Sequence, residues 1–477
     1  MPHGTRHLRL PRVITAGLAA ILLVLGVASS AGTAPAAAAT AGAPNVLVLN
    51  ADDWRSDPAG ISMRSYMPKT WAWLNGSAAV YPQSEVSNPN CCPSRASLMT
   101  GRYDHNNGVK TQADGLKLDF NSTIQHYLHT NGYQTGLVGK FLNSFPQNQS
   151  PPDFDYFAMW EVSDYLPPFA TNVNGHGVKA TKYASTYFGD RVMDALTKFA
   201  AKPGRPWYLY GAVHAPHTTS VRQPDGSIQH LAIPEPKYAN APVPACLQPG
   251  EADVSDQPKY VSWVHLDAAL LRKICTSQMR AMMSVDDAYD RAFSYLANSG
   301  QLSHTLVVVT SDNGLLWGEH NREGKFVPFL PSVRVPLLVR WDGHLAPGTN
   351  NNLVSNVDLA PTILLAAGLS ANPAVPMDGH SLLSGYQRHL QLNEYWYDIK
   401  DGKVPTWAQI HTDTWAYNEY YKADGSLMSR AYYNLASDPG ENLNLLGDRA
   451  TSNDPPNLSQ LAAQLAATKR CVGTACP

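Results

Sequence analysis

The chain has 477 residues, with 36 Lys and Arg against 38 Asp and Glu, and charged residues make up only 16% of it. That length allows roughly two to four domains, and a chain with 44% hydrophobic residues can bury a sizeable core. The formal charge of −2 excludes a general nucleic-acid binder, and the composition excludes global disorder and coiled coil. Six cysteines are too few for a disulfide-built scaffold but enough for two staples in an exported protein.

The first segment has the pattern of a secretory signal peptide. Its basic start contains Arg6, Arg9 and Arg12. An apolar run over 13–27 follows, and small residues ending in AAAATAGAP come next. We expect residues 1–39 to be the signal peptide, with cleavage between Ala36 and Ala43 and export through the secretion machinery to the extracellular space. The alternative is an uncleaved membrane anchor, because the run approaches the ~18 residues that can span a bilayer. Removal of 1–39 leaves a formal charge of −5.

Short runs of aliphatic and β-branched residues then recur, as expected for strands buried on both faces. They are Asn45–Asn50, Tyr133–Gly139, Trp207–Val213, Thr305–Thr310 and Val335–Arg340. Segments of helical period lie between them, and the clearest is Arg280–Ser299, which stops before Gly300. This alternation predicts a doubly wound α/β domain over residues 44–370, with a mainly parallel sheet flanked by helices.

Two later regions depart from this alternation. Residues 217–258 are rich in Pro, Gly and polar residues, which predicts a long loop or insertion across one face. After Gly368 the chain becomes rich in aromatic residues, and Asp424–Gly425 between two such runs is a hairpin signal. We therefore expect residues 371–477 to form a smaller C-terminal α+β subdomain with a small antiparallel sheet, and residues 457–470 to form a terminal helix.

Polar residues follow four of the predicted strands, at the carboxyl ends where open α/β sheets bind ligands. They are Asp52, Asp53, Lys140, His214, His217, Asp312 and Asn313. An Asp-Asp pair considered alone is more often a cap or a turn than a pair of metal ligands. Together, the three aspartates and Asn313 offer hard oxygen ligands, which favour Ca²⁺ or Mg²⁺ over zinc. A divalent cation would also relieve the repulsion between adjacent carboxylates.

The most informative segment is Cys91–Arg102, CCPSRASLMTGR. Pro93 suits the first turn of a helix and Gly101 suits its end, so Cys91 is expected at a helix N-terminus. Such an end stabilises an anion or a developing anionic oxygen. From these residues alone, a buried thiol or a disulfide with a distant cysteine remains an alternative.

The pattern C-x-P-S-R-x-x-x-L/M-T-G-R resembles the sulfatase family motif, in which the first Cys is converted to Cα-formylglycine (3-oxoalanine). Other family landmarks stand in chain order: Asp52-Asp53, Gly139-Lys140, Ala215-Pro216-His217, Ser311-Asp312-Asn313-Gly314, and Gly318-Glu319-His320 followed by Lys325 and RVPLLVR. The last trace is YYNLASDPGENLNLL, so the resemblance covers residues 44–446. It implies an alkaline-phosphatase-like version of the predicted fold.

The resemblance also implies an activity, the hydrolysis of aryl sulfates or sulfated sugars to an alcohol and inorganic sulfate. It implies bound Ca²⁺, with Mg²⁺ as a second possibility, and a formylglycine-generating enzyme as a partner. One hydroxyl of the hydrated aldehyde at position 91 would attack sulfur and the other would then drive release of sulfate. By position, the metal ligands are Asp52, Asp53, residue 91, Asp312 and Asn313; Arg95 holds the hydrate, Lys140 and Lys325 bind sulfate oxygens, and His217 is a candidate general acid.

The segment Gly139–Asn143, GKFLN, departs from the pattern of many family members, which carry a His two residues after the Lys. It is similar to the form found in N-acetylglucosamine-6-sulfatases and heparan-type endosulfatases, where Asn143 takes the place of that His in binding substrate. His105 and His320 are each expected either to orient substrate or to hydrogen-bond their own loop, and His214 is expected to be structural. Two other functions stay open: a phosphonate monoester or phosphodiester hydrolase using the same site, and an unmodified glycan-binding homologue without catalysis.

Five thiols remain if Cys91 is modified. Spacing and an exported location favour a Cys471–Cys476 disulfide that closes a short C-terminal loop. They also favour a Cys246–Cys275 disulfide at the predicted insertion, with Cys92 left as a buried free thiol.

Overall fold

A computed structural model describes residues 42–56, 62–160, 165–246, 251, 253–261, 267–370, 373–398 and 404–477. The predicted signal peptide, residues 1–39, lies outside the described residues. Among the helices that are described, none combines the length and the apolar character needed to cross a bilayer.

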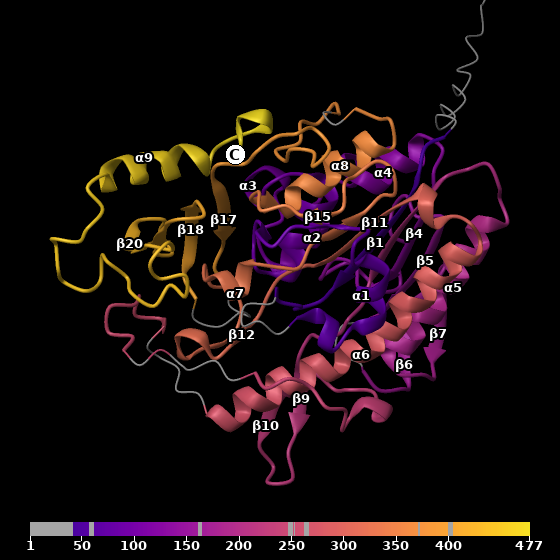
Figure 1. Cartoon of the computed structure of the whole chain (residues 1–477), viewed down its shortest axis with the longest axis horizontal. Coiled ribbons are helices and arrows are strands. Elements are labelled where there is room, and N and C mark those ends of the chain that lie inside the picture. Colours follow the sequence, from indigo (N-terminus) through magenta and orange to yellow (C-terminus); the bar gives the residue numbers. More distant parts are fainter. Residues whose placement is uncertain are drawn as a thin grey trace, which may run out of the picture. The chain divides into compact units, whose positions relative to one another are not determined.

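The centre of the fold is a ten-stranded mixed sheet (Figure 1). Its strands, in spatial order, are β15 (Gly348–Thr349), β2 (Ala79–Val80), β14 (Leu338–Arg340), β11 (Thr305–Ser311), β1 (Asn45–Ala51), β8 (Trp207–Ala212), β4 (Gln134–Gly139), β5 (Tyr156–Trp160), β6 (Phe169–Val173) and β7 (His176–Ala180). The strands from β11 to β5 run parallel, whereas β14 and β6 pair antiparallel with their inner neighbours. The mainly parallel sheet is therefore confirmed, and all five predicted strands belong to it.

Alternate residues of β1 enter two separate hydrophobic cores. Leu47 and Leu49 pack in one core with helices α1 (Pro68–Leu74), α5 (Ala184–Ala200) and α6 (Ala268–Asn298). Val46 and Val48 pack in the other core with helices α2 (Cys91–Thr100), α4 (Ile124–Thr130) and α8 (Leu359–Ala366). Figure 1 shows the two helix groups on opposite sides of the sheet. Because successive strand residues point to opposite faces, a strand covered on both sides needs the uninterrupted apolar run seen in the sequence.

Helix α6 is longer than the sequence prediction. It begins at Ala268 rather than at Arg280, and the side chain of Asp267 caps it by accepting a hydrogen bond from the backbone N–H of Ala269 at 2.8 Å. Its end agrees with the prediction, since Gly300 follows with a φ of +69°. The predicted helix type and end are thus confirmed, and the predicted start is wrong.

The segment predicted as a long loop contains regular structure. Strands β9 (Thr219–Arg222) and β10 (Ile228–Leu231) form an antiparallel hairpin, and a 3₁₀ turn, η4 (Pro236–Tyr238), follows. The long-loop alternative is therefore wrong for these residues, whereas the alternative of an insertion stays a prediction. Neither strand contains a fully buried residue, so no hydrophobic alternation marked them in the sequence. Beyond the hairpin, the predicted Cys246–Cys275 disulfide ties this region to α6.

The C-terminal part of the chain carries the predicted small antiparallel sheet. Its order is β17 (Gln391–Tyr395), β18 (Thr406–His411), β19 (Ala416–Tyr421) and β20 (Leu427–Tyr433), and Asp424–Gly425 lies in the last turn. Helix α9 (Leu458–Thr468) confirms the predicted terminal helix. The domain boundary between residues 370 and 371 stays a prediction.

Short elements connect these parts. They are η1 (Met63–Ser65), β3 (Ser84–Glu85), α3 (Asp104–Asn107), η2 (Gln112–Lys117), η3 (Phe120–Ser122), η6 (Leu302–His304), β12 (Leu316–Trp317), η7 (Glu319–Asn321), β13 (Glu323–Gly324), α7 (Leu330–Val333), β16 (Val354–Ser355), η8 (Asn356–Asp358) and η10 (Gly473–Ala475).

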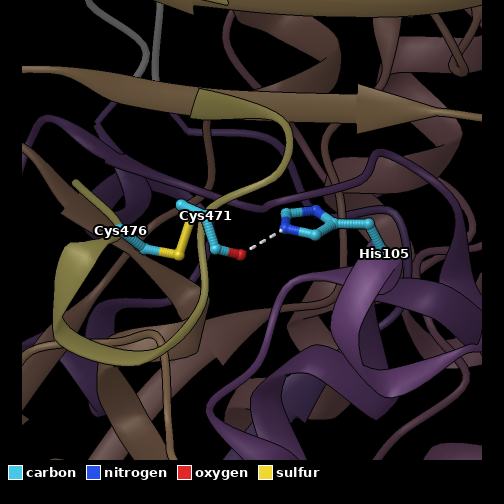
Figure 2. Close-up of side chains that lie close together, drawn as sticks. All are labelled: His105, Cys471 and Cys476. Atoms are coloured by element: carbon cyan, nitrogen blue, oxygen red, sulfur yellow. Dashed lines mark hydrogen bonds between the residues drawn. A yellow bond between two sulfur atoms is a disulfide. The ribbon is translucent and has the colours of Figure 1, made fainter. Parts of the chain in front are cut away.

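The last residues of the chain fold back against the segment that follows α2 (Figure 2). The predicted Cys471–Cys476 disulfide closes a loop, and the carbonyl oxygen of Cys471 accepts hydrogen bonds from His105 Nε2 at 3.0 Å and Asn106 Nδ2 at 2.8 Å. His105 Nδ1 also lies 2.7 Å from a carboxylate oxygen of Glu394 on β17. These contacts agree with the loop-bonding alternative for His105.

Glu85 on β3 joins the C-terminal sheet to the rest of the structure. It is fully buried, and its carboxylate lies 2.7 Å from His411 Nε2 on β18 and 3.0 Å from Arg334 Nη2. Burial alone would raise the pKa of Glu85, but the charges of His411 and Arg334 lower it to about 2. Burial of His411 would lower the pKa of its ring, but the neighbouring Glu85 carboxylate raises it above the ordinary value.

We expect Glu85→Gln to lower the free energy of unfolding at pH 7 by about 3 kcal/mol, because it leaves the buried His411 and the partly buried Arg334 without their carboxylate. The folded-state pKa of Glu85 lies below its ordinary value of 4.5, so its contribution is complete above pH 4.5 and is lost as the pH falls toward 2. Urea unfolding of both proteins at several pH values measures this. A difference between them that does not shrink on acidification would contradict the assignment.

Candidate active site

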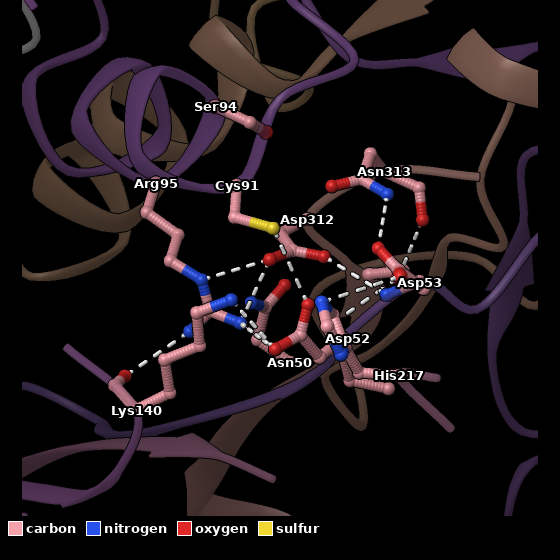
Figure 3. Close-up of polar contacts among 12 residues, drawn as sticks. Asn50, Asp52, Asp53, Cys91, Ser94, Arg95, Lys140, His217, Asp312 and Asn313 are labelled. Atoms are coloured by element: carbon pink, nitrogen blue, oxygen red, sulfur yellow. Dashed lines mark hydrogen bonds and ion pairs between the residues drawn. The ribbon is translucent and has the colours of Figure 1, made fainter. Parts of the chain in front are cut away.

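Four neighbouring strands bring the sequence-predicted polar residues to one edge of the sheet (Figure 3). Strands β11, β1, β8 and β4 are parallel, so their carboxyl ends meet at the same edge. The residues delivered there are Asp52 and Asp53 after β1, Lys140 after β4, His214 and His217 after β8, and Asp312 and Asn313 after β11. The structure therefore brings together residues that lie far apart in the sequence.

Helix α2 places Cys91 at this edge. The helix begins at Cys91 and ends at Gly101, whose φ of +66° is the left-handed conformation that glycine adopts readily. All ten residues of α2 are buried. The Cys91 Sγ lies 3.5 Å from Asp52 Oδ1 and 2.8 Å from Lys325 Nζ. Burial raises the pKa of the Cys91 thiol to about 12, so an unmodified thiol is protonated at neutral pH.

Two lysines neutralise the adjacent aspartates. Lys140 Nζ lies 2.7 Å from Asp52 Oδ2, and Lys325 Nζ lies 2.5 Å from Asp53 Oδ1. Burial opposes ionisation of both carboxyl groups, but Lys140 holds the pKa of Asp52 well below its ordinary value and Lys325 lowers that of Asp53. Both aspartates are therefore ionised at neutral pH, and the edge carries paired charges.

Arg95 forms the third ion pair of the cluster. Its guanidinium donates from Nε to Asp312 Oδ2 at 2.9 Å, and its Nη2 lies 2.8 Å from the same oxygen. Arg95 Nη1 also donates to the carbonyl oxygen of Lys140 at 3.1 Å. Because Arg95 lies one turn after Cys91 and is fully buried, it locks the start of α2 against the ends of β4 and β11.

The oxygen donors of the cluster, from Asp52, Asp53 and Asn313, fit a hard divalent cation. Carboxylate oxygens of Asp52 and Asp53, the Cys91 Sγ and a ring nitrogen of His217 lie within 4.8 Å of one another. Lys325 Nζ already lies between two such oxygens, Asp53 Oδ1 and, at 3.2 Å, Asn313 Oδ1. Oxygen donors of this kind suit Ca²⁺ or Mg²⁺. The geometry adds His217 to the cluster, although the sequence placed it near the leaving group.

The two histidines after β8 differ in exposure. His217 is 27% exposed at its side chain, and its Nε2 lies 3.7 Å from Asp53 Oδ2. His214 is buried beneath it, with ring centroids 5.2 Å apart, and packs against Tyr165. Burial lowers the pKa of His214 to about 4, so this ring is neutral at pH 7. Only His217 of the two is open to a ligand.

Two predicted substrate-binding residues lie beside the cluster rather than within it. His320 Nδ1 lies 2.9 Å from Glu251 Oε2, and its ring stacks on Phe329 with centroids 3.7 Å apart. Asn143 lines a cavity of about 360 Å³ next to Lys140. Within the described part of the chain, neither side chain hydrogen-bonds to the carboxylates or the lysines of the cluster, and their contact with substrate stays a prediction.

Sequence reasoning missed several residues that support the site. Tyr165 donates its hydroxyl hydrogen bond to the carbonyl oxygen of His217 at 2.6 Å. Arg55 pairs with Glu319 at 2.7 Å, and Gln278 of α6 contacts the loops after both β8 and β11. In the sequence, Arg55 was marked as a site residue only by its position shortly after Asp53. Nothing in the sequence marked Gln278, a single Gln on a helix.

Comparisons with known proteins identify the family of this chain. The sulfatase family model matches residues 44–369, and a model for the C-terminal part of N-sulphoglucosamine sulphohydrolase matches residues 318–469. An extracellular sulfatase SULF-1 homolog of Drosophila melanogaster is 30% identical over 71% of this chain, and a putative extracellular Sulf-1 homolog of Caenorhabditis elegans is 28% identical over 77%. The chain spans 31% and 54% of those two relatives. Human N-acetylglucosamine-6-sulfatase is 27% identical, with 96% of this chain and 90% of the relative covered.

Two solved structures share the fold. The structure of BT4656 in complex with its substrate D-glucosamine-2-N,6-O-disulfate has a TM-score of 0.73 and 18% identity, covering 89% of this chain and 97% of its own. The phosphonate monoester hydrolase of Agrobacterium radiobacter has a TM-score of 0.69 and 20% identity, with coverages of 89% and 96%. The alkaline-phosphatase-like architecture expected from the sequence is thereby confirmed. With the family model matching most of its length, the chain belongs to the sulfatase family.

Proposed function

We propose that this protein hydrolyses sulfate esters, with sulfated sugars of the N-acetylglucosamine-6-sulfate type as its substrate class. The observation that carries the proposal is the position of Cys91. It begins a buried helix, and its side chain contacts both the negatively charged Asp52 and the positively charged Lys325. A nucleophile at this position would face both a cation site and a group that neutralises developing negative charge.

The proposed nucleophile is a formylglycine formed from Cys91, and the proposed metal is Ca²⁺ or Mg²⁺. A hydrated formylglycine supplies two hydroxyls on one carbon, one to attack sulfur and one to release sulfate. Asp52, Asp53, Asp312 and Asn313 would hold the metal. Lys140 and Lys325 are both buried and pair with Asp52 and Asp53; they would bind sulfate oxygens and stabilise charge on them.

His217 is the proposed general acid. It is the partly exposed member of the cluster, and its Nε2 lies close enough to Asp53 to be oriented toward the reacting atoms. An alkoxide leaving from a sugar is strongly basic and needs a proton, which a histidine side chain beside the leaving oxygen would supply. The basic and apolar start of the chain, together with two relatives described as extracellular, supports secretion after signal cleavage.

A substrate panel tests the proposed activity. We expect the purified protein to release sulfate from 4-nitrophenyl sulfate and from N-acetylglucosamine-6-sulfate, with turnover of phosphate diesters at least about tenfold slower, a difference of about 1.4 kcal/mol in barrier. Ion chromatography of released sulfate and phosphate measures both. Faster hydrolysis of diesters would favour the phosphodiesterase alternative. No release from any ester by a protein that carries the aldehyde would contradict the proposed activity.

A further inference from the structure

One buried amide joins two loops of the site from outside. Gln278 lies on α6 and is 2% exposed. Its Nε2 donates to the carbonyl oxygen of Pro216 at 3.0 Å, and its Oε1 accepts from Trp317 Nε1 at 2.5 Å. An indole N–H only donates and a carbonyl only accepts, so the two partners leave one orientation for the amide.

The first partner of Gln278 is the turn that carries His217. Pro216 directly precedes His217, and three consecutive carbonyl groups of this turn accept hydrogen bonds. The backbone N–H of Asp52 reaches Ala215, Gln278 reaches Pro216, and the Tyr165 hydroxyl reaches His217. Gln278 is thus the middle of three contacts that set the backbone from which the His217 side chain projects.

The second partner belongs to the loop that leads to Lys325. Trp317 lies on β12, its backbone N–H donates to Glu319 Oε2 at 2.7 Å, and its ring lies 4.5 Å from the Arg55 guanidinium. Arg55 pairs with Glu319 and belongs to the segment after β1. Through Trp317, Gln278 is connected to the segments after β1 and β11 as well as to the turn after β8.

Gln278 has no other evident reason to be polar. The buried residues around it on α6, Ile274, Ala281 and Met282, are apolar and belong to the core beneath the sheet. A buried amide costs free energy unless its donors and acceptor are bonded, so an apolar residue would suit this face equally well if packing were its only role. Among the residues that the structure describes, the two hydrogen-bond partners of the Gln278 amide lie instead in loops of the site.

We infer that Gln278 is a positioning residue for His217, an inference that rests on the proposed function. The amide holds the His217 turn at a set distance from Trp317, and thereby places the imidazole where it can protonate the leaving oxygen. Losing the amide frees the Pro216 carbonyl and shifts the turn without removing any group that touches substrate. Within the described part of the chain, Gln278 makes no hydrogen bond to residue 91 or to the aspartates after β1 and β11, so we expect these groups to keep their places.

A misplaced His217 would change the relative rates on two substrates, whereas a general loss of protein stability would not. A leaving group that is already a weak base, such as 4-nitrophenolate, departs without a proton, whereas phenolate benefits from one. The two aryl sulfates are nearly equal in size, so they differ mainly in this demand. A displaced His217 should therefore slow phenyl sulfate far more than 4-nitrophenyl sulfate.

The test compares Gln278→Met with Gln134→Met. Gln134 is equally buried and donates to a backbone carbonyl, that of Phe199, at 3.1 Å, but it lies at the amino end of β4, away from the site. We expect Gln278→Met to lower kcat on phenyl sulfate by about tenfold or more and on 4-nitrophenyl sulfate by less than about threefold, as for a misplaced acid catalyst. Gln134→Met should leave the ratio of the two rates unchanged.

Equal losses on both substrates in Gln278→Met, or no loss on either, would leave the ratio of the two rates unchanged and would overturn the inference. If that variant does not fold, Trp317→Phe removes the indole N–H that donates to Gln278 and keeps a smaller aromatic ring at this position. It should shift the ratio in the same direction, and an unshifted ratio would again overturn the inference. His217→Ala distinguishes a failure of the Gln278 inference from a failure of the proposed general acid. A selective loss there without one in Gln278→Met refutes only the role of Gln278, whereas no selective loss in His217→Ala refutes the proposed general acid.

Discussion

Replacing Cys91 with alanine is expected to abolish sulfate-ester hydrolysis while the protein stays folded. The Cys91 Sγ contacts two charged groups of the cluster, Asp52 and Lys325, and alanine is a better helix former than cysteine. The loss should exceed about 10⁴-fold in kcat, the scale on which enzymes lose activity when a nucleophile is removed. Release of 4-nitrophenol and circular dichroism of the variant measure the two halves of this prediction.

Cys92→Ala is the matched control. Cys92 is the neighbouring free cysteine, is equally buried, and its Sγ points instead to the Asn143 carbonyl oxygen at 3.6 Å. This variant should lose less than about 1.5 kcal/mol of stability and keep turnover within a few fold, as expected for removal of one small buried group. Peptide mass spectrometry of the active wild-type protein should find the aldehyde at position 91. An active preparation in which Cys91 is entirely thiol would contradict the proposed nucleophile.

Asp312→Asn is expected to cost nearly as much activity and, in addition, the bound metal. Asp312 holds Arg95 through two short contacts and accepts a hydrogen bond from the backbone N–H of Asp53 at 3.1 Å. Asparagine keeps the shape of the side chain but removes one of three negative charges that favour a divalent cation. Metal content by atomic emission and turnover after chelation and readdition of Ca²⁺ or Mg²⁺ test this prediction. We expect a fall in kcat of about 10³-fold or more.

A buried aspartate outside the site provides the comparison. Asp286 on α6 is 3% exposed and accepts hydrogen bonds from the backbone N–H groups of Lys69 and Thr70 at the start of α1. Asp286→Asn should lower stability but leave metal content and kcat near those of the wild type. If Asp312→Asn retained both metal and activity, its assignment as a ligand would be wrong.

The architecture was predictable because its strongest signals are local. Each central strand is a continuous apolar run, and such runs can be recognised without knowing their partners. The convergence of Asp52, Lys140, His217 and Asp312 followed from one general rule, that parallel strands end at a shared edge. The helix start at Cys91 was equally visible, since Pro93 and Gly101 mark its two ends.

Other features depend on contacts that are distant in sequence or on weak patterns. The β9–β10 hairpin escaped prediction because its strands bury no side chain completely. The early start of α6 was marked only by Asp267, a single capping residue. Gln278 meets Pro216 and Trp317 across 62 and 39 residues, and no local pattern announces such a pairing.

The burial of α2 has a consequence for the timing of biosynthesis. Cys91 is 1% exposed, and one of the groups that enclose it, Lys325, stands 234 residues later in the chain. β1 likewise gains its partner β11 only when residues 305–311 have been made. Under the proposed mechanism, an enzyme that converts Cys91 to an aldehyde would meet an extended, accessible segment only on the growing or newly made chain. Once these later strands have assembled, the same residue is closed to it, so the yield of active protein would be decided before folding ends.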